Sequence, residues 1–400
     1  METPTSLAEA ALLAKRYIGD GGASSPCKFR WRSLPEPGVN PPVNAAVDGG
    51  SRRIETETRT YYVIKSWGGV FTPSLSMEKH YAGAGFITPP IHAEERIAIY
   101  REILEAYTAL QVLPDKGLLL MDGSIRPVVK WWRPGFGGTG PRMRVALERA
   151  LEGVEEWVRT SSDPLAESIR GCRRLGEPPC MERLIQDSRV RPASAVYAMS
   201  HKPMDGEWIV LLEVTEKLYL YMQVLREAWS RGVKPVFITK TSRQTSLCKG
   251  SHPDVYYIRR MEPRRPGYTV WEESTSIGGY EITGLGREDL GQLYPDVAGI
   301  RRFYEEEIAV VEAYARLAPG APILLVGIVV PAHDAPGSLG EAEDLVASLL
   351  EGLASIPGKG YPAPLFIAHQ RARVDRGELP PLERILGIDL EPRERAMLEY

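Results

Sequence analysis

Two apolar runs of the chain end in the same way, and they constrain the fold more than any other feature of the sequence. Residues 43–47 lead into Asp48-Gly49-Gly50-Ser51, and residues 118–121 lead into Asp122-Gly123-Ser124. Each pattern predicts a buried strand that delivers one carboxylate to an edge where the backbone turns sharply. Two such aspartates could hold a divalent cation, because hard cations prefer carboxylate oxygens. An Asp-Gly pair after a strand is more often only a turn, so the repeat alone leaves both interpretations open.

The composition indicates a folded protein without a general attraction for nucleic acid. The 400 residues are 43% apolar and 25% charged, which suits a large core in more than one domain or in one elaborated domain. Lys and Arg number 49 against 52 acids, and the net charge of −3 excludes a global basic field. Arginines do cluster locally at 259–265 and 371–376, although such clusters are usually solvated faces.

The cysteines show neither metal-binding nor disulfide spacing. They are Cys27, Cys172, Cys180 and Cys248. Their irregular spacing predicts reduced cysteines in a cytoplasmic protein. The N-terminus has no apolar stretch of signal-peptide length, and the longest apolar run, 323–330, is too short to cross a bilayer. The 33 prolines and the many Arg and Glu residues are compatible with a heat-adapted organism.

The predicted elements alternate between strands and helices, which indicates a mixed α/β sheet covered by helices. Strands are expected at 43–48, 54–66, 118–122, 208–214, 236–239, 255–258 and 323–330. Helices are expected at 3–18, 93–112, 143–160, 180–187, 216–231, 301–316 and 340–354. We expect an extended connector at 20–42 and, because of its glycines and prolines, a long loop at 68–90.

The helix at 93–112, which lies between the two acid-bearing strands, offers a third carboxylate. On a helical wheel Glu102 lies at the edge of a broad apolar arc, and Glu105 lies further towards solvent. Together with Asp48 and Asp122, either glutamate could form a site for one or two Mg²⁺ or Mn²⁺ ions that activates a water for phosphodiester hydrolysis. Either glutamate is more commonly an ordinary charged residue on a helix surface.

Three residues further along the chain are candidates for the same site. Lys240 follows a buried strand and could contact a phosphate or orient the attacking water, or it could simply reach solvent. His369 follows the apolar run 365–368 and is a candidate metal ligand or phosphate contact, although a lone His is more commonly a hydrogen-bonded core residue. Tyr361 could act beside it or only pack. The sequence lacks GxxxxGK[ST], which excludes a P-loop ATPase.

In their joint order these motifs resemble the NurA nucleases of archaea and some bacteria. The resemblance covers about residues 43 to 385, and its last two motifs are Lys240-Thr241-Ser242-Arg243 and the segment from Tyr361 to His369. One departure is an extra glycine in the first motif, which reads Asp48-Gly-Gly-Ser where Asp-Gly-Ser is usual.

The resemblance implies a ribonuclease H-like α/β fold, a homodimer and nuclease action on DNA that depends on Mn²⁺ or Mg²⁺. The implied activities are 5′ to 3′ exonuclease and single-strand endonuclease, on single-stranded DNA and duplex ends. The implied partner is the hexameric HerA ATPase, in the resection of double-strand breaks. The nuclease domain would span 43–385 with a helical insertion at about 140–205, between an N-terminal helix and connector at 1–42 and a tail at 386–400.

The resemblance also assigns roles to residues. By motif, Asp48 and Asp122 look like the metal-binding aspartates, and Tyr361 and His369 look like the C-terminal active-site pair. The family spacing favours Glu105 as the helical acid, whereas the helical wheel favours Glu102. Lys240 would contact phosphate. Two alternatives stay open: a non-catalytic protein of the same fold that clamps DNA or regulates a motor ATPase, and a phosphatase or RNase with the same carboxylate chemistry.

Overall fold

The computed structural model describes residues 27–379 except for two long segments, 126–205 and 272–298, and for several short breaks. The short breaks are 28, 39–41, 57–58, 73, 89, 246, 249–250, 263 and 357. The helices expected at 3–18, 143–160 and 180–187, the insertion expected at 140–205 and the tail expected at 386–400 therefore lie outside the described residues.

The described strands form one sheet of nine strands in the order β1-β7-β8-β9-β6-β5-β2-β3-β4. In chain order they are β1 (Phe29–Arg32), β2 (Asn44–Glu55), β3 (Thr60–Phe71), β4 (Leu75–Phe86), β5 (Gly117–Asp122), β6 (Val233–Thr239), β7 (Gly267–Trp271), β8 (Ile308–Arg316) and β9 (Leu324–Pro331). β5 runs parallel to both β2 and β6, and all other neighbouring pairs are antiparallel.

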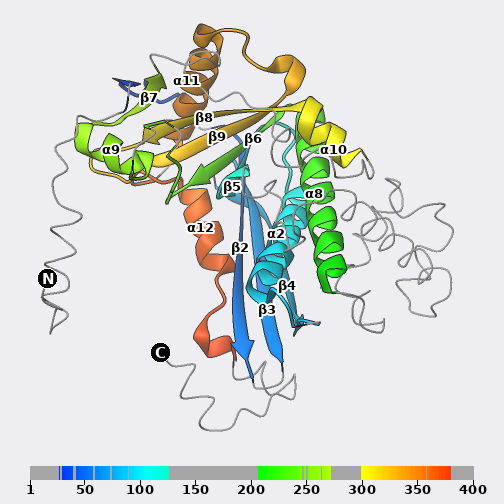
Figure 1. Ribbon diagram of the computed structural model, residues 1–400. Coiled ribbons are helices and arrows are strands. Elements are labelled where there is room, and N and C mark those ends of the chain that lie inside the picture. The colour runs from blue at the N-terminus through cyan, green and yellow to red at the C-terminus, as the bar shows by residue number, and fades with distance from the viewer. Residues whose placement is uncertain are drawn as a thin grey trace, which may run out of the picture.

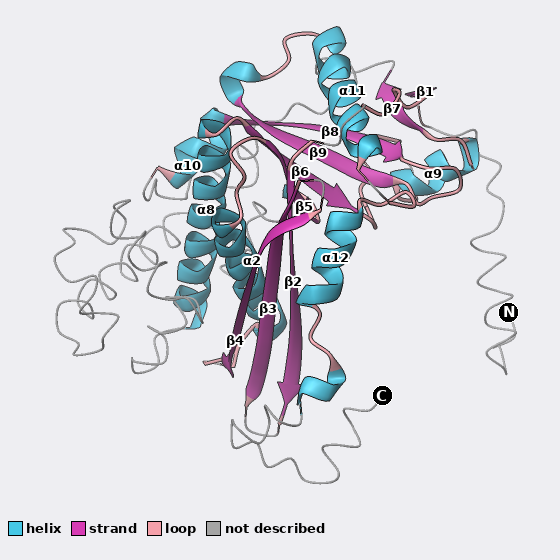
Figure 2. Cartoon of the chain, turned by 180° about the vertical axis from the view of Figure 1, so that it is seen from behind, coloured by secondary structure: helices cyan, strands magenta, loops and turns pink. Residues whose placement is uncertain are grey.

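Half of this sheet has the ribonuclease H-like arrangement. β2, β3 and β4 form an antiparallel meander, and β5 and β6 continue the sheet on the other side of β2, parallel to it. The remaining strands extend the sheet beyond β6, as Figure 1 and Figure 2 show. The predicted class, a mixed ribonuclease H-like sheet flanked by helices, is confirmed.

Helices cover both faces of the sheet. The main ones are α2 (Ala93–Gln111), α8 (Gly206–Ser230), α9 (Asp254–Met261), α11 (Leu339–Ser355) and α12 (Ala363–Ala372). The short ones are α10 (Ile300–Arg302), the π-helix η2 (Phe303–Glu307), and the 3-10 helices η3 (Ala332–Asp334) and η4 (Arg376–Glu378).

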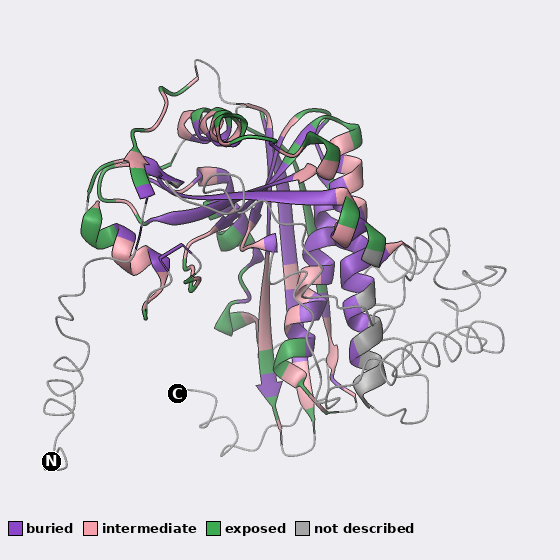
Figure 3. Ribbon diagram, turned by 45° about the horizontal axis from the view of Figure 1, so that its top comes forward, coloured by how far each residue is buried: buried purple, intermediate pink, exposed green. Residues whose placement is uncertain are grey.

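Alternate residues of each strand serve the two faces, because successive side chains of a strand point in opposite directions. In β2, Ala45 and Val47 pack in the core beneath α2 and α8, whereas Ala46 packs in the core beneath α11 and α12. The strands between these helices are mostly buried (Figure 3).

The prediction of a long loop at 68–90 is wrong, because this stretch completes β3 and forms β4. A Cβ atom at Gly68 would lie 2.8 Å from the side chain of Thr108 and 2.9 Å from that of Val112, so this glycine lets α2 pack closely on the sheet. The glycines were interpreted as turn signals, whereas here they mark close packing within a strand.

Three further elements differ from expectation. The stretch 208–214, expected as a strand, belongs to α8, and 255–258 belongs to α9. The second half of the helix expected at 301–316 is β8, a strand that is buried at every position. Periodicity cannot separate a short buried strand from a buried helical segment, and burial in the centre of a sheet overrides helix propensity.

The predicted absence of disulfides is also wrong. Cys27 and Cys248 form a disulfide that ties the segment before β1 to the segment before α9. Two cysteines 221 positions apart give no local spacing signal, and only the fold brings them together. β1, which lies within the connector expected at 20–42, pairs with β7. None of the described helices is long and apolar enough to cross a membrane.

Candidate metal centre

The two aspartates of the repeated motif lie on neighbouring parallel strands. The pairing of β2 with β5 ends at Val47 opposite Met121, so that Asp48 and Asp122 follow directly on the two strands. Asp48 is buried, and its Oδ1 accepts a hydrogen bond of 2.7 Å from the backbone N–H of Gly49. The two parallel strands thus bring their carboxylates together, as the sequence predicted. The turn expected directly after Asp48 is wrong, because β2 continues to Glu55 and stays paired with β3, so that Asp48 lies within the strand at the point where its pairing with β5 ends.

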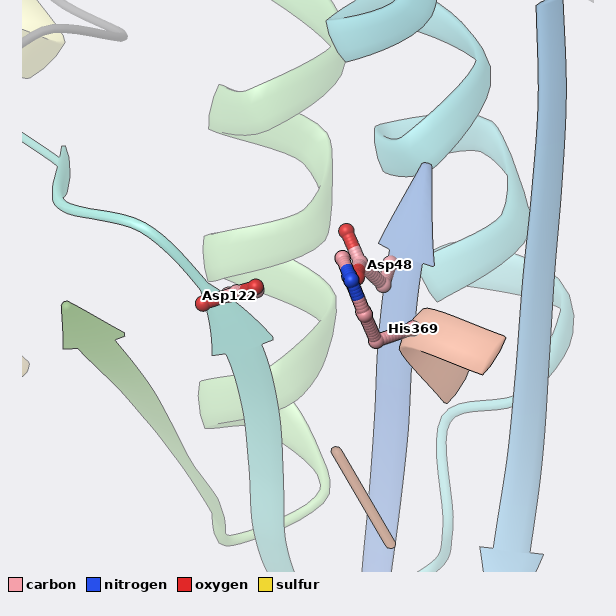
Figure 4. Close-up of side chains that lie close together, drawn as sticks. All are labelled: Asp48, Asp122 and His369. Atoms are coloured by element: carbon pink, nitrogen blue, oxygen red, sulfur yellow. The ribbon is translucent and has the colours of Figure 1, made fainter. Parts of the chain in front are cut away.

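α12 brings His369 to the same place from the far end of the chain. Nδ1 of His369 lies 2.8 Å from Oδ2 of Asp48. One donor atom each from Asp48, Asp122 and His369 lies within 4.8 Å of the other two (Figure 4). The side chain of His369 is 51% exposed, so it is not a core histidine. These three residues are called the donor cluster below.

Two further predicted residues contact Asp122. Nζ of Lys240, directly after β6, donates to Oδ2 of Asp122 at 3.1 Å, and the hydroxyl of Tyr361 donates to Oδ1 at 3.3 Å. The ammonium group of Lys240 also lies 4.3 Å from the centre of the Tyr361 ring. Burial and the nearby carboxylates of Asp122 and Asp48 raise the pKa of Tyr361, so its hydroxyl keeps its proton and remains a donor.

The two candidate glutamates of α2 have different surroundings. Glu102 lies 3.1 Å from Nζ of Lys217 on α8. Glu105 is buried, and the position a Cβ atom of Gly49 would take lies only 2.4 Å from its Oε1. Glu105 therefore lies directly against the backbone next to Asp48, although it is not part of the donor cluster. The structure places Glu105, rather than Glu102, beside the aspartates.

Arg101 is a partner of Glu105 that the sequence reasoning did not identify. Its Nε lies 3.1 Å from Oε1 of Glu105, one helical turn away, yet this nitrogen makes no hydrogen bond. Burial, with a smaller contribution from the charge of Asp48, raises the pKa of Glu105 to about 8 against the lowering effect of Arg101. The i, i+4 spacing of the two residues was the available sequence signal.

This raised pKa predicts a pH-dependent stability of the metal-free protein. Since the folded pKa is about 8 and the ordinary value is 4.5, the folded chain holds more protons between these values, and its stability falls as pH rises through this window. Glu105→Gln cannot ionise, so it removes this pH-dependent loss of folding free energy. The loss amounts to about 1.4 kcal/mol for each unit by which the folded pKa of Glu105 exceeds its unfolded pKa. Urea unfolding in EDTA at pH 6 and pH 9 measures it.

The matched control is Glu102→Gln, which neutralises an acid on the same helix. We expect the gain in stability of Glu105→Gln over wild type to grow from pH 6 to pH 9, while Glu102→Gln shows no comparable growth. Parallel behaviour of the two variants would contradict the assignment to Glu105.

The two glycines after Asp48 serve opposite faces of β2. A Cβ atom at Gly49 would collide with Glu105 from α2, and one at Gly50 would lie 2.3 Å from the backbone oxygen of Ala372, the last residue of α12. The extra glycine of the motif therefore gives room for the end of the helix that carries His369.

The donor cluster suits a divalent cation. Burial and the charge of Asp122 raise the pKa of Asp48, although the hydrogen bonds from His369 and the Gly49 N–H group act to lower it. These two partners therefore offset only part of the cost of holding the negative charges of the two aspartates together. A bound cation would compensate both carboxylates. Two carboxylates and one imidazole form a donor set that Mn²⁺ accepts, since it binds oxygen ligands readily and tolerates nitrogen.

A family model described as the NurA domain matches residues 42–374, which is most of the chain. The chain belongs to the NurA family. Comparison with curated protein sequences gives no significant match.

Solved NurA structures share the fold. The NurA nuclease from Sulfolobus solfataricus is 17% identical, with a TM-score of 0.59 over 91% of this chain and 90% of that one. A NurA structure bound to dAMP and manganese is 16% identical, with a TM-score of 0.55 over 97% and 95%. A NurA structure with manganese is 14% identical, with a TM-score of 0.50 over 90% and 92%. At these identities the likeness shows the NurA fold.

Proposed function

We propose that this protein is a divalent-metal-dependent DNA nuclease whose active site is the donor cluster. The observation that carries the proposal is the convergence of Asp48, Asp122 and His369, from three separate elements, within 4.8 Å at the point where the pairing of β2 with β5 ends. Family membership supports the same chemistry, because one NurA structure was solved with dAMP and manganese.

Asp48, Asp122 and His369 would hold the metal, either Mn²⁺ or Mg²⁺, with Glu105 as a further carboxylate. The ion, when bound, supplies activation of water and stabilisation of the leaving oxygen. Tyr361 donates to Asp122 and fixes its orientation, and Lys240 offers a positive charge to a phosphate beside the same carboxylate. His369 is half exposed on α12, so that a substrate can reach its imidazole.

The finer points of the proposal come from the family. They are 5′ to 3′ exonuclease and single-strand endonuclease action on DNA ends, homodimer formation, and cooperation with a hexameric HerA-type ATPase in end resection. The disulfide between Cys27 and Cys248 supports an origin in a heat-adapted organism, since intracellular proteins of hyperthermophiles are the main exception to the scarcity of intracellular disulfides.

The test of the proposed function uses labelled single-stranded and duplex DNA with Mn²⁺, with and without EDTA. We expect cleavage with Mn²⁺ and none with EDTA. Mn²⁺ binding, followed by electron paramagnetic resonance, is expected for wild type and not for Asp48→Asn. A protein that binds DNA without a chelator-sensitive product would be the non-catalytic clamp, and preferential hydrolysis of RNA or phosphomonoesters would indicate an RNase or a phosphatase.

Gly50→Ala is expected to reduce cleavage by a factor of about 100, because a displacement of about 1 Å at an active site has effects of this size. The new Cβ atom would lie 2.3 Å from the carbonyl oxygen of Ala372, and since this oxygen belongs to the backbone, the end of α12 must shift and carry His369 with it. Overpacking of this kind also costs about 1 to 3 kcal/mol of stability. Steady-state cleavage rates and urea unfolding measure the two effects.

Gly340→Ala is the matched control, because nothing lies within 4 Å of the Cβ position at this exposed glycine of α11. We expect it to leave cleavage unchanged and to alter stability by less than about 1 kcal/mol. Full activity of Gly50→Ala would show that the end of α12 does not position His369.

A further inference from the structure

A cluster of aromatic and basic side chains lies on α9, outside the donor cluster. The rings of His252 and Tyr256 lie 4.4 Å apart, and those of Tyr256 and Tyr257 lie 5.3 Å apart. The guanidinium of Arg260 lies 5.1 Å from the centre of the Tyr256 ring and donates to its hydroxyl at 2.8 Å. The three rings are partly exposed, and Tyr257 also packs against the core cluster that contains Cys248 and Ile258.

The same helix ends in a concentration of positive charge. Residues 259–265 contain four arginines and a single acid, Glu262. All four arginines, Arg259, Arg260, Arg264 and Arg265, are exposed. Arg260 donates to the hydroxyl of Tyr256, and Arg265 donates to the hydroxyl of Ser33. Since hydroxyl groups are neutral, these hydrogen bonds do not compensate the positive charges of the two arginines. The α9 surface, meaning His252, Tyr256, Tyr257 and these arginines, thus combines aromatic rings with a local excess of positive charge.

This surface is held rigidly to the sheet. Asp254, the first residue of α9, is fully buried and accepts hydrogen bonds from the backbone N–H groups of Leu247 and Cys248 and from the hydroxyl of Tyr314 on β8. Cys248 is also tied to Cys27 by the disulfide. A rigid platform loses little conformational freedom when it binds a ligand.

The α9 surface is also close to the proposed active site along the chain. The backbone N–H of Asp254 donates to the carbonyl oxygen of Gln244, four residues after Lys240. Since four residues of extended chain span at most about 14 Å, Gln244 lies within about this distance of Lys240. Arg243, between them, is exposed and adds another positive charge on this route. Figure 1 shows α9 next to the end of β6, from which Lys240 follows.

We propose that the α9 surface binds single-stranded nucleic acid that extends from the donor cluster, by stacking bases on Tyr256 and its neighbouring rings and by pairing phosphates with the arginines. Accessible aromatic rings beside a cationic groove are the means by which proteins hold single strands without sequence preference. The charge of this surface is complementary to a phosphate backbone. The inference rests on the proposed function, because it supplies the holding site for that substrate.

The test measures binding of a fluorescent oligothymidine of about 16 nucleotides, a length within the range of known single-strand sites, by anisotropy in EDTA. We expect Arg259→Ala/Arg260→Ala and Tyr256→Ala each to weaken binding about tenfold, and the double arginine variant to reduce the slope of log K against log salt by about 1.4. Tyr256→Phe keeps the ring and is expected to bind within about twofold of wild type.

The control for net charge is Lys116→Ala/Lys234→Ala, which removes two exposed positive charges. These lysines lie at the starts of β5 and β6, whereas Asp122 and Lys240 lie at the other ends of these strands. An equal loss of affinity in this control and in the arginine variant would overturn the proposal, as would wild-type affinity of the arginine variant. Equal effects of Tyr256→Ala on single-stranded and duplex DNA would overturn the stacking, because the bases of a duplex are already stacked. Since EDTA prevents cleavage, failure of the nuclease proposal leaves these results readable.

Discussion

Replacing Asp48 by asparagine is expected to lower metal-dependent DNA cleavage at least about a thousandfold while leaving thermal stability nearly unchanged. The change removes a charge from the donor cluster but keeps the shape of the side chain. Asp48 is buried next to Asp122, and its raised pKa shows that its charge is not well compensated in the metal-free protein. Its loss therefore relieves repulsion rather than breaking a stabilising pair. Initial cleavage rates and thermal unfolding in EDTA measure the two quantities.

Asp334→Asn is the matched control, because Asp334 also lies beside a histidine, with its Oδ1 3.7 Å from Nε2 of His333, but on the surface in η3. We expect this variant to cleave at the wild-type rate. Retained cleavage by Asp48→Asn would remove Asp48 from the mechanism, and unfolding of Asp48→Asn at ambient temperature would show that the residue is structural instead.

The largest loss of stability is expected from Arg96→Met. Arg96 and Glu213 are fully buried, and their ion pair, with a closest contact of 2.8 Å, joins α2 to α8. Arg96 also donates to the backbone oxygen of Thr88 at 3.1 Å. Removing the arginine leaves a buried carboxylate without its cation, which costs about 3 to 5 kcal/mol. Urea unfolding at pH 8 in EDTA measures the change.

Three comparisons separate this effect from the loss of an ordinary ion pair. Arg226→Met breaks a pair with Glu307 in which both side chains are more than a third exposed, and we expect a loss below about 1 kcal/mol. Arg96→Met/Glu213→Leu removes both buried charges and should recover most of the stability. Burial raises the pKa of Glu213, so in Arg96→Met this acid folds protonated and the loss should be smaller at pH 5 than at pH 8. A loss independent of pH would contradict this explanation.

The sequence predicted the elements whose signals are local. The helix expected at 93–112 is α2, the helix expected at 340–354 is α11, and the strand expected at 118–122 is β5. The strand expected to end at Asp48 is the first part of β2, which continues to Glu55. In each case burial on one side or a sharp change in composition marks the element. The order of these elements was enough to predict the α/β class.

The errors arose where tertiary packing decides the conformation. The helix expected at 301–316 includes the whole of β8, yet all positions of β8 are buried in a strand that lies between β7 and β9. Gly68 was interpreted as part of a loop, although its role is to admit α2. No pattern within either segment reports the neighbour that determines its structure.

The candidate site was predictable as a set of residues but not as a geometry. The motifs named Asp48, Asp122, Lys240, Tyr361 and His369, and the structure places all five in one connected group. The choice between Glu102 and Glu105 required the position of Gly49, because the helical wheel reports only which face of α2 is apolar. Arg101 was not identified, and Gly50 was noted only as part of the extra-glycine motif, since the roles of both depend on how α2 and α12 pack against β2.

The pairing of Asp48 with His369 joins residues 321 positions apart (Figure 4). Strand β2 leaves the ribosome before α12, and His369 on α12 is synthesised only 321 residues after Asp48. A nascent polypeptide that ends between Asp122 and His369 therefore has both aspartates but lacks the imidazole that completes the cluster. The order of translation thus delays assembly of the full set of ligands until α12 has been made.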